Sequence, residues 1–319
     1  MRMDMKNRKW LIAGAAGSAA GMIAMRTYQR YRNELDAART RVMSGSQIIE
    51  TTNGPVEYAL TGEGPPVLVV HGAGGGYDQS LLAAQIGGDD FLAIAMSRSG
   101  YLGTPMAKDP SPAAQADAYA ALLDALEIPK AAIIGISAGG PSSLQFAIRH
   151  PERCSALIMV SAVSHRVPID IDMHSCSLRW LLGNEFRGWL LSTLMQPILL
   201  SLFGVTPKVC ARLSPAQKSW VRRFVATLQP ISSKYQGMLN DFEQIKIMEP
   251  YPLEKITAPT LIVHAADDRM VPVDHGHLVA NSIQGSRFVE LSSGGHMMIE
   301  HHQIIGAEIR FFIEKKAGL

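Results

Sequence analysis

Cysteine is scarce in this chain: only Cys154, Cys176 and Cys210 occur among 319 residues. An odd number of cysteines without CxxC or CxxH spacing indicates neither a disulfide framework nor a zinc site, so we expect no metal ligands among them. Charged residues are also few, at 18% of the chain against 47% hydrophobic residues. This composition is typical of a globular protein with a sizeable core and argues against long disordered segments.

A net positive charge is missing from most of the chain. The formal net charge is +2, but the first 43 residues hold nine Arg and Lys against three acidic residues, which gives +6 there and leaves −4 for the remainder. Such a body has no basic field for a phosphate backbone, so we expect no nucleic-acid partner. The length fits either two domains or one large core with an insertion.

The N-terminal segment, residues 1–43, differs from the rest. Between basic flanks, Trp10 to Met25 contains no charged residue. As a helix this stretch would be about 24 Å long, which is marginal for a hydrocarbon core of roughly 30 Å. It is long for a cleavable signal peptide, and basic residues follow it. We predict an uncleaved membrane anchor of undecided orientation; the alternative is a helix packed on the body of a cytoplasmic protein.

Short apolar runs and helical periods alternate after residue 44. The Asn53-Gly54 dipeptide between two strand-like runs predicts a β-hairpin. Continuous apolar runs suit strands that are buried on both faces of a parallel sheet, and two intervening helices are Pro112 to Leu126 and Ala138 to Arg149. The predicted class is therefore α/β. The predicted strands are Gln47 to Thr51, Val56 to Thr61, Val67 to Val70, Phe91 to Met96, Ala131 to Ile136, Ala156 to Ser161, Thr260 to His264 and Arg287 to Leu291.

One interval breaks this alternation. About a hundred residues separate the strand that ends near Ser161 from the strand that starts at Thr260, far more than an ordinary crossover requires. The interval is apolar and helical in pattern, and between Trp180 and Phe203 its charged residues are Glu185 and Arg187. We predict an inserted helical subdomain at residues 164–251, within a core formed by residues 44–163 and 252–319.

A nucleophile motif follows the predicted strand Ala131 to Ile136. Gly135-Ile136-Ser137-Ala138-Gly139 has the GxSxG pattern directly before a helix. Small residues at Gly135 and Gly139 permit a sharp turn that exposes the Ser137 hydroxyl at the end of the strand. The sequence thus predicts that Ser137 is a nucleophile; a serine that only caps the helix is the alternative.

A serine nucleophile needs a base and a group that orients the base. Asp267 and Asp268 follow one late strand, and His296 lies in a glycine-rich loop after the last strand, so all three come at carboxyl ends of strands, where α/β sheets form their sites. We predict His296 as the base. His301 and His302 fall about a turn into the next helix, and we expect both at the surface.

A glycine-rich loop, His71 to Gly76, follows the strand Val67 to Val70. Its amides can point at a developing oxyanion, so the predicted donors are the backbone N–H groups of Ala73 and Ala138. A phosphate-binding loop is the alternative, but neither a GxGxxG motif nor a Walker lysine is present. We expect His71 and Gly72 to support the loop.

Together these motifs resemble the α/β-hydrolase fold superfamily over about Gln47 to Lys316. In that family the acidic loop commonly reads GxxDxxxP, and the stretch from Ala265 to Pro272 matches with alanine in place of glycine. The resemblance implies that Asp268 is the triad acid and Asp267 its neighbour. It also implies that the insertion is a helical cap over the site.

The resemblance further implies a serine hydrolase without cofactor that cleaves carboxylic esters or related acyl compounds through an acyl-enzyme. Ser137 would attack, His296 would carry the proton and Asp268 would hold the imidazole. The apolar insertion predicts a small-molecule substrate with an uncharged, apolar acyl group. Three alternatives stay open: a C–C bond hydrolase, an acyltransferase, and a silent or slow hydrolase-fold protein that binds a ligand. The sequence does not indicate the oligomeric state.

Overall fold

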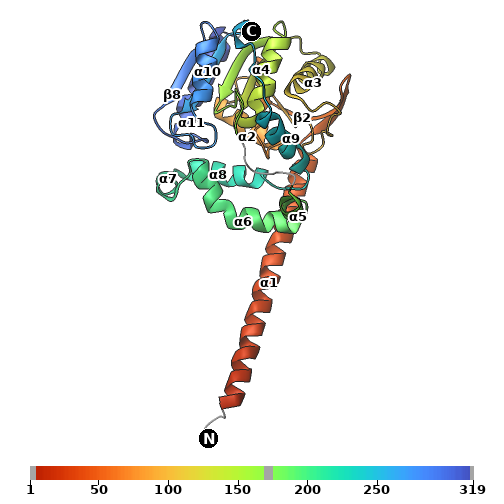
Figure 1. The fold of residues 1–319 in the computed structure, drawn as a ribbon, viewed down its shortest axis with the longest axis vertical. Helices are drawn as coiled ribbons and strands as arrows, with labels where there is room; N and C mark the ends of the chain where they lie inside the picture. Colours follow the sequence, from red (N-terminus) through yellow and green to blue (C-terminus); the bar gives the residue numbers. More distant parts are fainter. Residues whose placement is uncertain (1–4, 169–174, 317–319) are drawn as a thin grey trace.

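The computed structural model describes residues 5–168 and 175–316; the side chains of residues 5–17, 19, 20, 178 and 316 are outside the description. An eight-stranded sheet forms its centre (Figure 1). The strand order is β1-β2-β4-β3-β5-β6-β7-β8, in which β1 and β2 are antiparallel to their neighbours and all other pairs are parallel. The strands are β1 (Gln47–Thr51), β2 (Gly54–Thr61), β3 (Pro66–Val70), β4 (Leu92–Met96), β5 (Ala131–Ile136), β6 (Cys154–Val160), β7 (Thr260–Ala265) and β8 (Arg287–Leu291).

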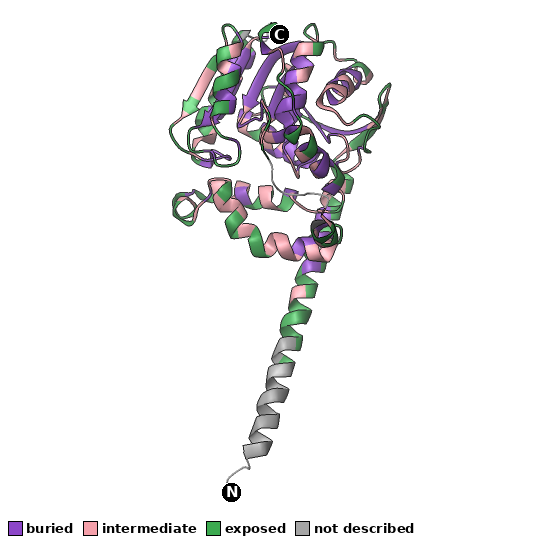
Figure 2. Ribbon diagram, viewed as in Figure 1, coloured by how far each residue is buried: buried purple, intermediate pink, exposed green. Residues whose placement is uncertain are grey.

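Helices cover both faces of this sheet, so the predicted α/β class is confirmed. The central parallel strands are largely buried (Figure 2), as their continuous apolar runs predicted. On one face Leu123, Leu144 and Val279 pack over the sheet, and on the other face Ile305 and Phe312 do so. The helices of the first face are α3 (Pro112–Ala125), α4 (Gly140–Arg149) and α10 (Asp274–Ser282), and those of the second are α2 (Tyr77–Gly87) and α11 (His302–Lys316).

Most helices of the insertion between β6 and β7 form a separate layer below the sheet in the view of Figure 1, whereas its last helix packs against the core. Local signals set where these helices begin: Thr206-Pro207 and Ser214-Pro215 each combine a side-chain cap with proline in the first turn. Asn184 caps the longest helix of the insertion with its side chain. The helices are α5 (Cys176–Leu182), α6 (Glu185–Leu202), α7 (Pro207–Arg212), α8 (Pro215–Thr227) and α9 (Tyr235–Lys246).

Helix α1 (Met5–Ser44) runs past this layer and extends away from the body (Figure 1). Tyr31, Leu35 and Ala38 are spaced along one face and are buried. The rings of Tyr31 and Trp189 on α6 lie 5.4 Å apart, which attaches α1 to the inserted helices. The C-terminal part of α1 is therefore an integral part of the fold.

The prediction of a membrane anchor at Trp10 to Met25 is wrong. Among the residues that the structure describes, no helix has both the length and the apolar character needed to cross a membrane. The uncharged stretch is rich in alanine and glycine, and the helix continues without a break into the basic residues from Arg26 onward. Most side chains of the stretch lie outside the described residues.

Candidate active site

Ser137 occupies the sharp turn between β5 and α4. Its backbone has φ = +52°, a left-handed conformation that is uncommon outside glycine and that characterises strained functional turns. A Cβ on Gly135 would lie 2.5 Å from Ser143 Oγ, and one on Gly139 would lie 2.7 Å from the carbonyl oxygen of His71. Larger residues at either position would displace the turn, so these glycines allow the Ser137 side chain to stand at the carboxyl end of β5.

His296 lies beside this serine. Its Nε2 is 3.0 Å from Ser137 Oγ, which is within hydrogen-bond distance for transfer of the hydroxyl proton. The loop that carries His296 is fixed to the inserted helices, because the N–H of Met297 donates to the carbonyl of Phe203 at the end of α6. The Phe203 ring also packs 5.6 Å from the imidazole. The position of the histidine therefore depends on both the core and the insertion.

Asp268 contacts the other nitrogen of this imidazole, with Oδ2 2.8 Å from His296 Nδ1. Its Oδ1 accepts the backbone N–H groups of Met270 and Val271. The adjacent Asp267 instead accepts the N–H of Gly295 at 2.8 Å. The two neighbouring carboxylates thus hold different parts of one loop: one bonds to the ring of His296 and the other to the backbone just before it.

The pKa of Asp268 is held well below its usual range. Burial by itself raises the pKa of this carboxyl group, but hydrogen bonds from His264 and His296 and the Val271 amide lower it by more. His264 Nε2 lies 3.4 Å from Asp268 Oδ2. The carboxylate therefore stays ionised, which fixes the His296 proton on Nδ1 and leaves Nε2 free to accept the proton of Ser137.

The glycine-rich loop lies against the serine. A Cβ on Gly72 would lie 2.9 Å from Ser137 Cβ, so only glycine lets the loop approach this closely. Ala73 packs against an apolar cluster that contains Ala138, so the two residues predicted as donors lie near each other beside Ser137. Backbone amides of these two residues, if directed at the substrate, would stabilise an oxyanion, so their role as donors stays a prediction.

His71 supports the loop from inside the core. It is completely buried; its Nε2 accepts the N–H of Arg98, and its Nδ1 therefore donates to the carbonyl of Gly72. Burial and the nearby Arg98 hold the pKa of His71 well below its usual value, so the ring stays neutral. A neutral ring with both nitrogens engaged in this way is a structural support for the loop.

A buried ionic network reaches the same loop from the insertion. Asp241 on α9 binds the guanidinium of Arg98 through two bonds of 2.7 and 2.5 Å and accepts the hydroxyl of Tyr101 at 2.5 Å. The Tyr101 oxygen in turn accepts the N–H of Gly74 at 3.3 Å. Sequence reasoning missed Tyr101, because no local motif distinguishes it and its partner Asp241 is 140 residues away.

An apolar pocket of about 100 Å³ opens beside the serine, here called the Ser137 pocket. Residues of the core and of the insertion line it together, among them Ile86, Val160, Ile305, Phe203 and Trp220. His302 also lines it, so the prediction that this residue lies at the surface is wrong. Its Nε2 donates to the carbonyl of Met297, and its ring packs edge-on against Trp220 at 4.6 Å. The insertion covers this histidine. No local sequence pattern predicts such a contact, because Trp220 lies far from His302 in the sequence.

One group of described residues has side-chain ligand atoms close enough to hold a metal ion: His165, Asp274 and His275, with these atoms within 4.8 Å of one another. Two features oppose this role. His275 Nδ1 accepts the N–H of Ser164, which leaves the ring proton on Nε2. The two imidazole rings also stack in parallel at 3.7 Å, so their lone pairs do not converge on one point. We assign no metal to this group.

Known proteins share this architecture. The sequence model of the alpha/beta hydrolase fold matches residues 65–303. An alpha/beta hydrolase fold protein from Nakamurella multipartita has a solved structure that is 31% identical, covers 86% of this chain and all of its own, and superposes with a TM-score of 0.75. The uncharacterized hydrolase YcgS of Bacillus subtilis is 27% identical over 79% of this chain and 92% of its own length.

A further relative has a more specific name. The 2-hydroxy-6-oxo-6-phenylhexa-2,4-dienoate hydrolase of Comamonas testosteroni is 28% identical over 76% of this chain and 84% of its own length. The family match covers most of the sheet, the serine turn, the insertion and the histidine loop. The chain belongs to the α/β-hydrolase fold family.

Proposed function

We propose that the protein is a serine hydrolase that cleaves carboxylic esters or related acyl compounds through an acyl-enzyme intermediate. The observation that carries this proposal is the continuous hydrogen-bonded chain from Ser137 through His296 to Asp268. The serine end of this chain lies in the apolar Ser137 pocket. A nucleophile, a base and an orienting acid in contact form the arrangement that activates a serine hydroxyl.

Each residue then has a distinct role in the proposed reaction. Ser137 Oγ bonds to the carbonyl carbon while His296 Nε2 takes the hydroxyl proton, and the N–H groups of Ala73 and Ala138 stabilise the oxyanion. The bond to the leaving alcohol breaks as His296 returns the proton to it. Water then repeats these steps on the acyl-enzyme and releases the acid, while Asp268 stabilises the charged imidazole throughout.

A C–C bond hydrolase is the second candidate, because relatives carry dienoate hydrolase names. A dienoate has a carboxylate, and no Arg or Lys occurs among the described residues that line the Ser137 pocket. A carboxylate buried there would have no cationic partner, which is unfavourable. The carboxylate of a dienoate would therefore have to lie outside this pocket, and the apolar lining favours an uncharged acyl group in either reaction.

The test is hydrolysis of chromogenic esters together with labelling by a fluorophosphonate, which bonds to activated serines. We expect the wild type to turn over esters and to be labelled, and Ser137→Ala to lose both, with kcat lower by several orders of magnitude. Ser292→Ala, at an exposed serine between β8 and His296, is the matched control and should keep both activities.

Two results would contradict the proposal. Labelling of Ser137→Ala as strong as that of the wild type would exclude Ser137 as the nucleophile. A wild-type protein that binds esters without turnover would instead be a ligand-binding member of the family. Adding an alcohol acceptor distinguishes a hydrolase from an acyltransferase. An acyltransferase would form a new ester with this alcohol, whereas a hydrolase would release the acid.

A further inference from the structure

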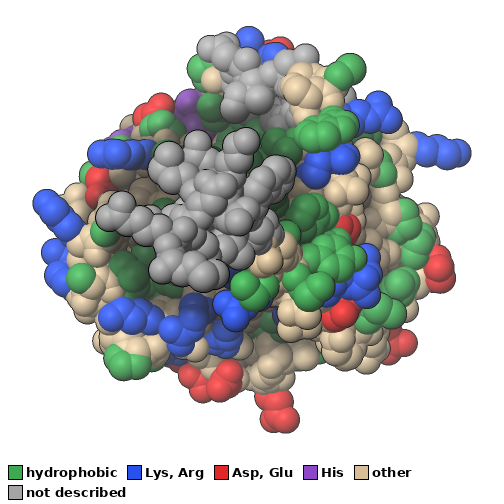
Figure 3. Space-filling model, turned by 90° about the horizontal axis from the view of Figure 1, so that it is seen from below, with side chains coloured by type: hydrophobic (Ala, Val, Ile, Leu, Met, Phe, Trp, Pro, Cys, Tyr) green, Lys and Arg blue, Asp and Glu red, His purple; other side chains and the backbone are tan. Residues whose placement is uncertain are grey.

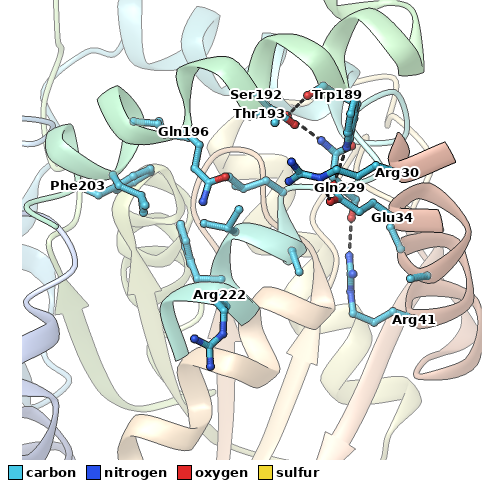
Figure 4. Close-up of a pocket in the computed structure, with 18 residues that line it drawn as sticks. Arg30, Glu34, Arg41, Trp189, Ser192, Thr193, Gln196, Phe203, Arg222 and Gln229 are labelled. Atoms are coloured by element: carbon cyan, nitrogen blue, oxygen red, sulfur yellow. Dashed lines mark hydrogen bonds and ion pairs between the residues drawn. The ribbon is translucent and has the colours of Figure 1, made fainter. Parts of the chain in front are cut away.

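A second and larger cavity lies beside the inserted helices. It encloses about 370 Å³ between α1, α6 and α8 (Figure 4), and we call it the α1 chamber. This volume lies within the range of pockets that bind medium-sized ligands, whereas the 100 Å³ of the Ser137 pocket lies below it. Helix α1 lies outside the residues that the family model matches, so the wall that it contributes is an addition to the common fold.

The α1 chamber adjoins the site. Phe203 and Phe224 line both the chamber and the Ser137 pocket, and their rings meet edge-on at 5.3 Å. Leu228 of the chamber lies 3.9 Å from the position that a Cβ on Gly74 would occupy, so the chamber also borders the glycine-rich loop. The two phenylalanine rings form a wall that the chamber shares with the pocket of the nucleophile.

The lining changes from apolar to polar along the chamber. Figure 4 shows Phe203 at one end and Arg30, Glu34 and Arg41 at the other, with Arg222 at the edge of the chamber on the side of α8. Leu199 and Leu200 belong to the same stretch of α6 as Phe203, and both line the chamber. A ligand that matches this lining has an apolar part near the site and a polar part farther from it.

The polar part of the lining has an excess of positive charge. Glu34 accepts bonds from Arg30 and from the Trp189 indole, each at 2.7 Å, and Arg41 binds Asp78 at 3.0 Å. Arg222 makes no ion pair with any residue that the structure describes, and its side chain is exposed. On the face in Figure 3, basic side chains lie among acidic and hydrophobic ones. A guanidinium without an ionic partner on this wall favours an anionic ligand group.

From these observations we propose that the α1 chamber binds the alcohol part of an amphiphilic ester, with an apolar chain past Phe203 and an anionic group near Arg222. The inference rests on the proposed function, since it puts the acyl group in the Ser137 pocket. It extends that function by naming the substrate class: esters of a medium-chain alcohol with a distal negative charge.

Binding of decanoate to full-length Ser137→Ala protein tests the chamber without turnover. We expect one binding site by calorimetry and about tenfold weaker binding after Thr193→Trp, which fills the chamber from α6. Leu194→Trp is the matched control, because Leu194 is 63% exposed on the same helix. Absence of decanoate binding, or equal affinity in both tryptophan variants, would overturn the chamber as a ligand site.

The charge of the ligand is tested with a second pair of variants. Arg222→Gln should weaken decanoate binding several-fold and leave decanol binding unchanged. Arg223→Gln should affect neither ligand, because Arg223 is exposed and bonds to Gln85 of the core. Equal binding of decanoate and decanol, with no effect of Arg222→Gln, would exclude an anionic group.

Turnover links the chamber to the reaction. We expect kcat/KM for the butanoate ester of 8-hydroxyoctanoate to exceed that for ethyl butanoate, and Thr193→Trp to reduce this ratio about tenfold. If decanoate binds as expected but no ester is hydrolysed, the proposed function fails while the chamber stands. If esters are hydrolysed and Thr193→Trp leaves the ratio unchanged, the chamber plays no part in substrate choice.

Discussion

The carboxylate of Asp267 accepts the backbone N–H of Gly295 at 2.8 Å, one residue before the histidine that faces Ser137. Asp268 bonds to that histidine directly, at 2.8 Å. Because both carboxylates bond to the same loop, we expect both aspartate-to-asparagine changes to lower kcat, but by different amounts. Asp268→Asn should lower kcat by about 10⁴, by analogy with the serine-protease triad, because the amide favours the wrong imidazole tautomer. Asp267→Asn keeps an acceptor for Gly295 and should cost far less.

The measurement for this pair is steady-state kcat on one chromogenic ester at a single pH. Circular dichroism of both variants controls for folding. A larger loss in Asp267→Asn than in Asp268→Asn would show that the orienting role belongs to Asp267 instead.

A second prediction concerns the link between the insertion and the glycine-rich loop. Tyr101→Phe removes the acceptor for the Gly74 N–H and one donor to the buried Asp241. We expect kcat to fall about tenfold to a hundredfold with little change in KM, because the loop loses precision while the substrate pocket stays intact. Tyr119→Phe is the control: Tyr119 is also buried, but its hydroxyl bonds to Ser142. Equal losses in both variants would indicate a general effect on stability.

Stability in acid depends in part on His302. Burial lowers the pKa of His302 to about 4, although its bond to the Met297 carbonyl raises it. Between pH 6.5 and 4 the unfolded chain binds a proton at this ring that the folded chain does not, so the free energy of unfolding falls as the pH falls. The loss amounts to at most about 1.4 kcal/mol per pH unit across this window.

His302→Gln keeps a donor for the Met297 carbonyl but removes the titration. We therefore expect urea midpoints of this variant to decline less than those of the wild type across the same acid range. His301→Gln, at the preceding residue, is the matched control and should keep the wild-type slope. The same slope in all three proteins would show that another group dominates acid unfolding.

The size of the Ser137 pocket predicts its acyl preference. Each added methylene should raise kcat/KM about fourfold, from roughly 0.8 kcal/mol of burial, until the pocket is full. Ala83→Leu narrows the pocket and should shorten the preferred acyl chain, whereas Gln85→Leu, exposed on the same helix, should not. A flat or falling series from acetyl onward in the wild type would mean that the apolar residues only pack the core.

Much of this architecture follows from local patterns. The eight strands and the serine turn were predictable because continuous apolar runs, an Asn-Gly dipeptide and small residues around Ser137 act over a few residues. The spacing from Asp268 to Pro272, compared with the acidic loop of the family, likewise favours Asp268 over its neighbour as the predicted acid. These signals are local, so they can be read without knowledge of the tertiary structure.

The remainder depends on contacts between distant segments. Tyr101 and Asp241 are 140 residues apart, and only the packing of α9 on the core brings them together. His302 is covered by Trp220 of the insertion, which its position early in a helix does not reveal. The uncharged N-terminal stretch suggested a membrane span, whereas the burial of Tyr31 and Leu35 reflects contacts with α6 that lie far along the sequence.

The packing of α1 on α6 has a practical consequence for work with this protein. Truncation before residue 45 would expose the aromatic cluster of Phe186 and Trp189 and leave the Trp189 indole without its bond to Glu34. Newly exposed aromatic surface of this kind promotes aggregation. A shortened protein would therefore be a poor substitute for the full chain, and inactivity in such a preparation would report on lost packing rather than on the chemistry of Ser137.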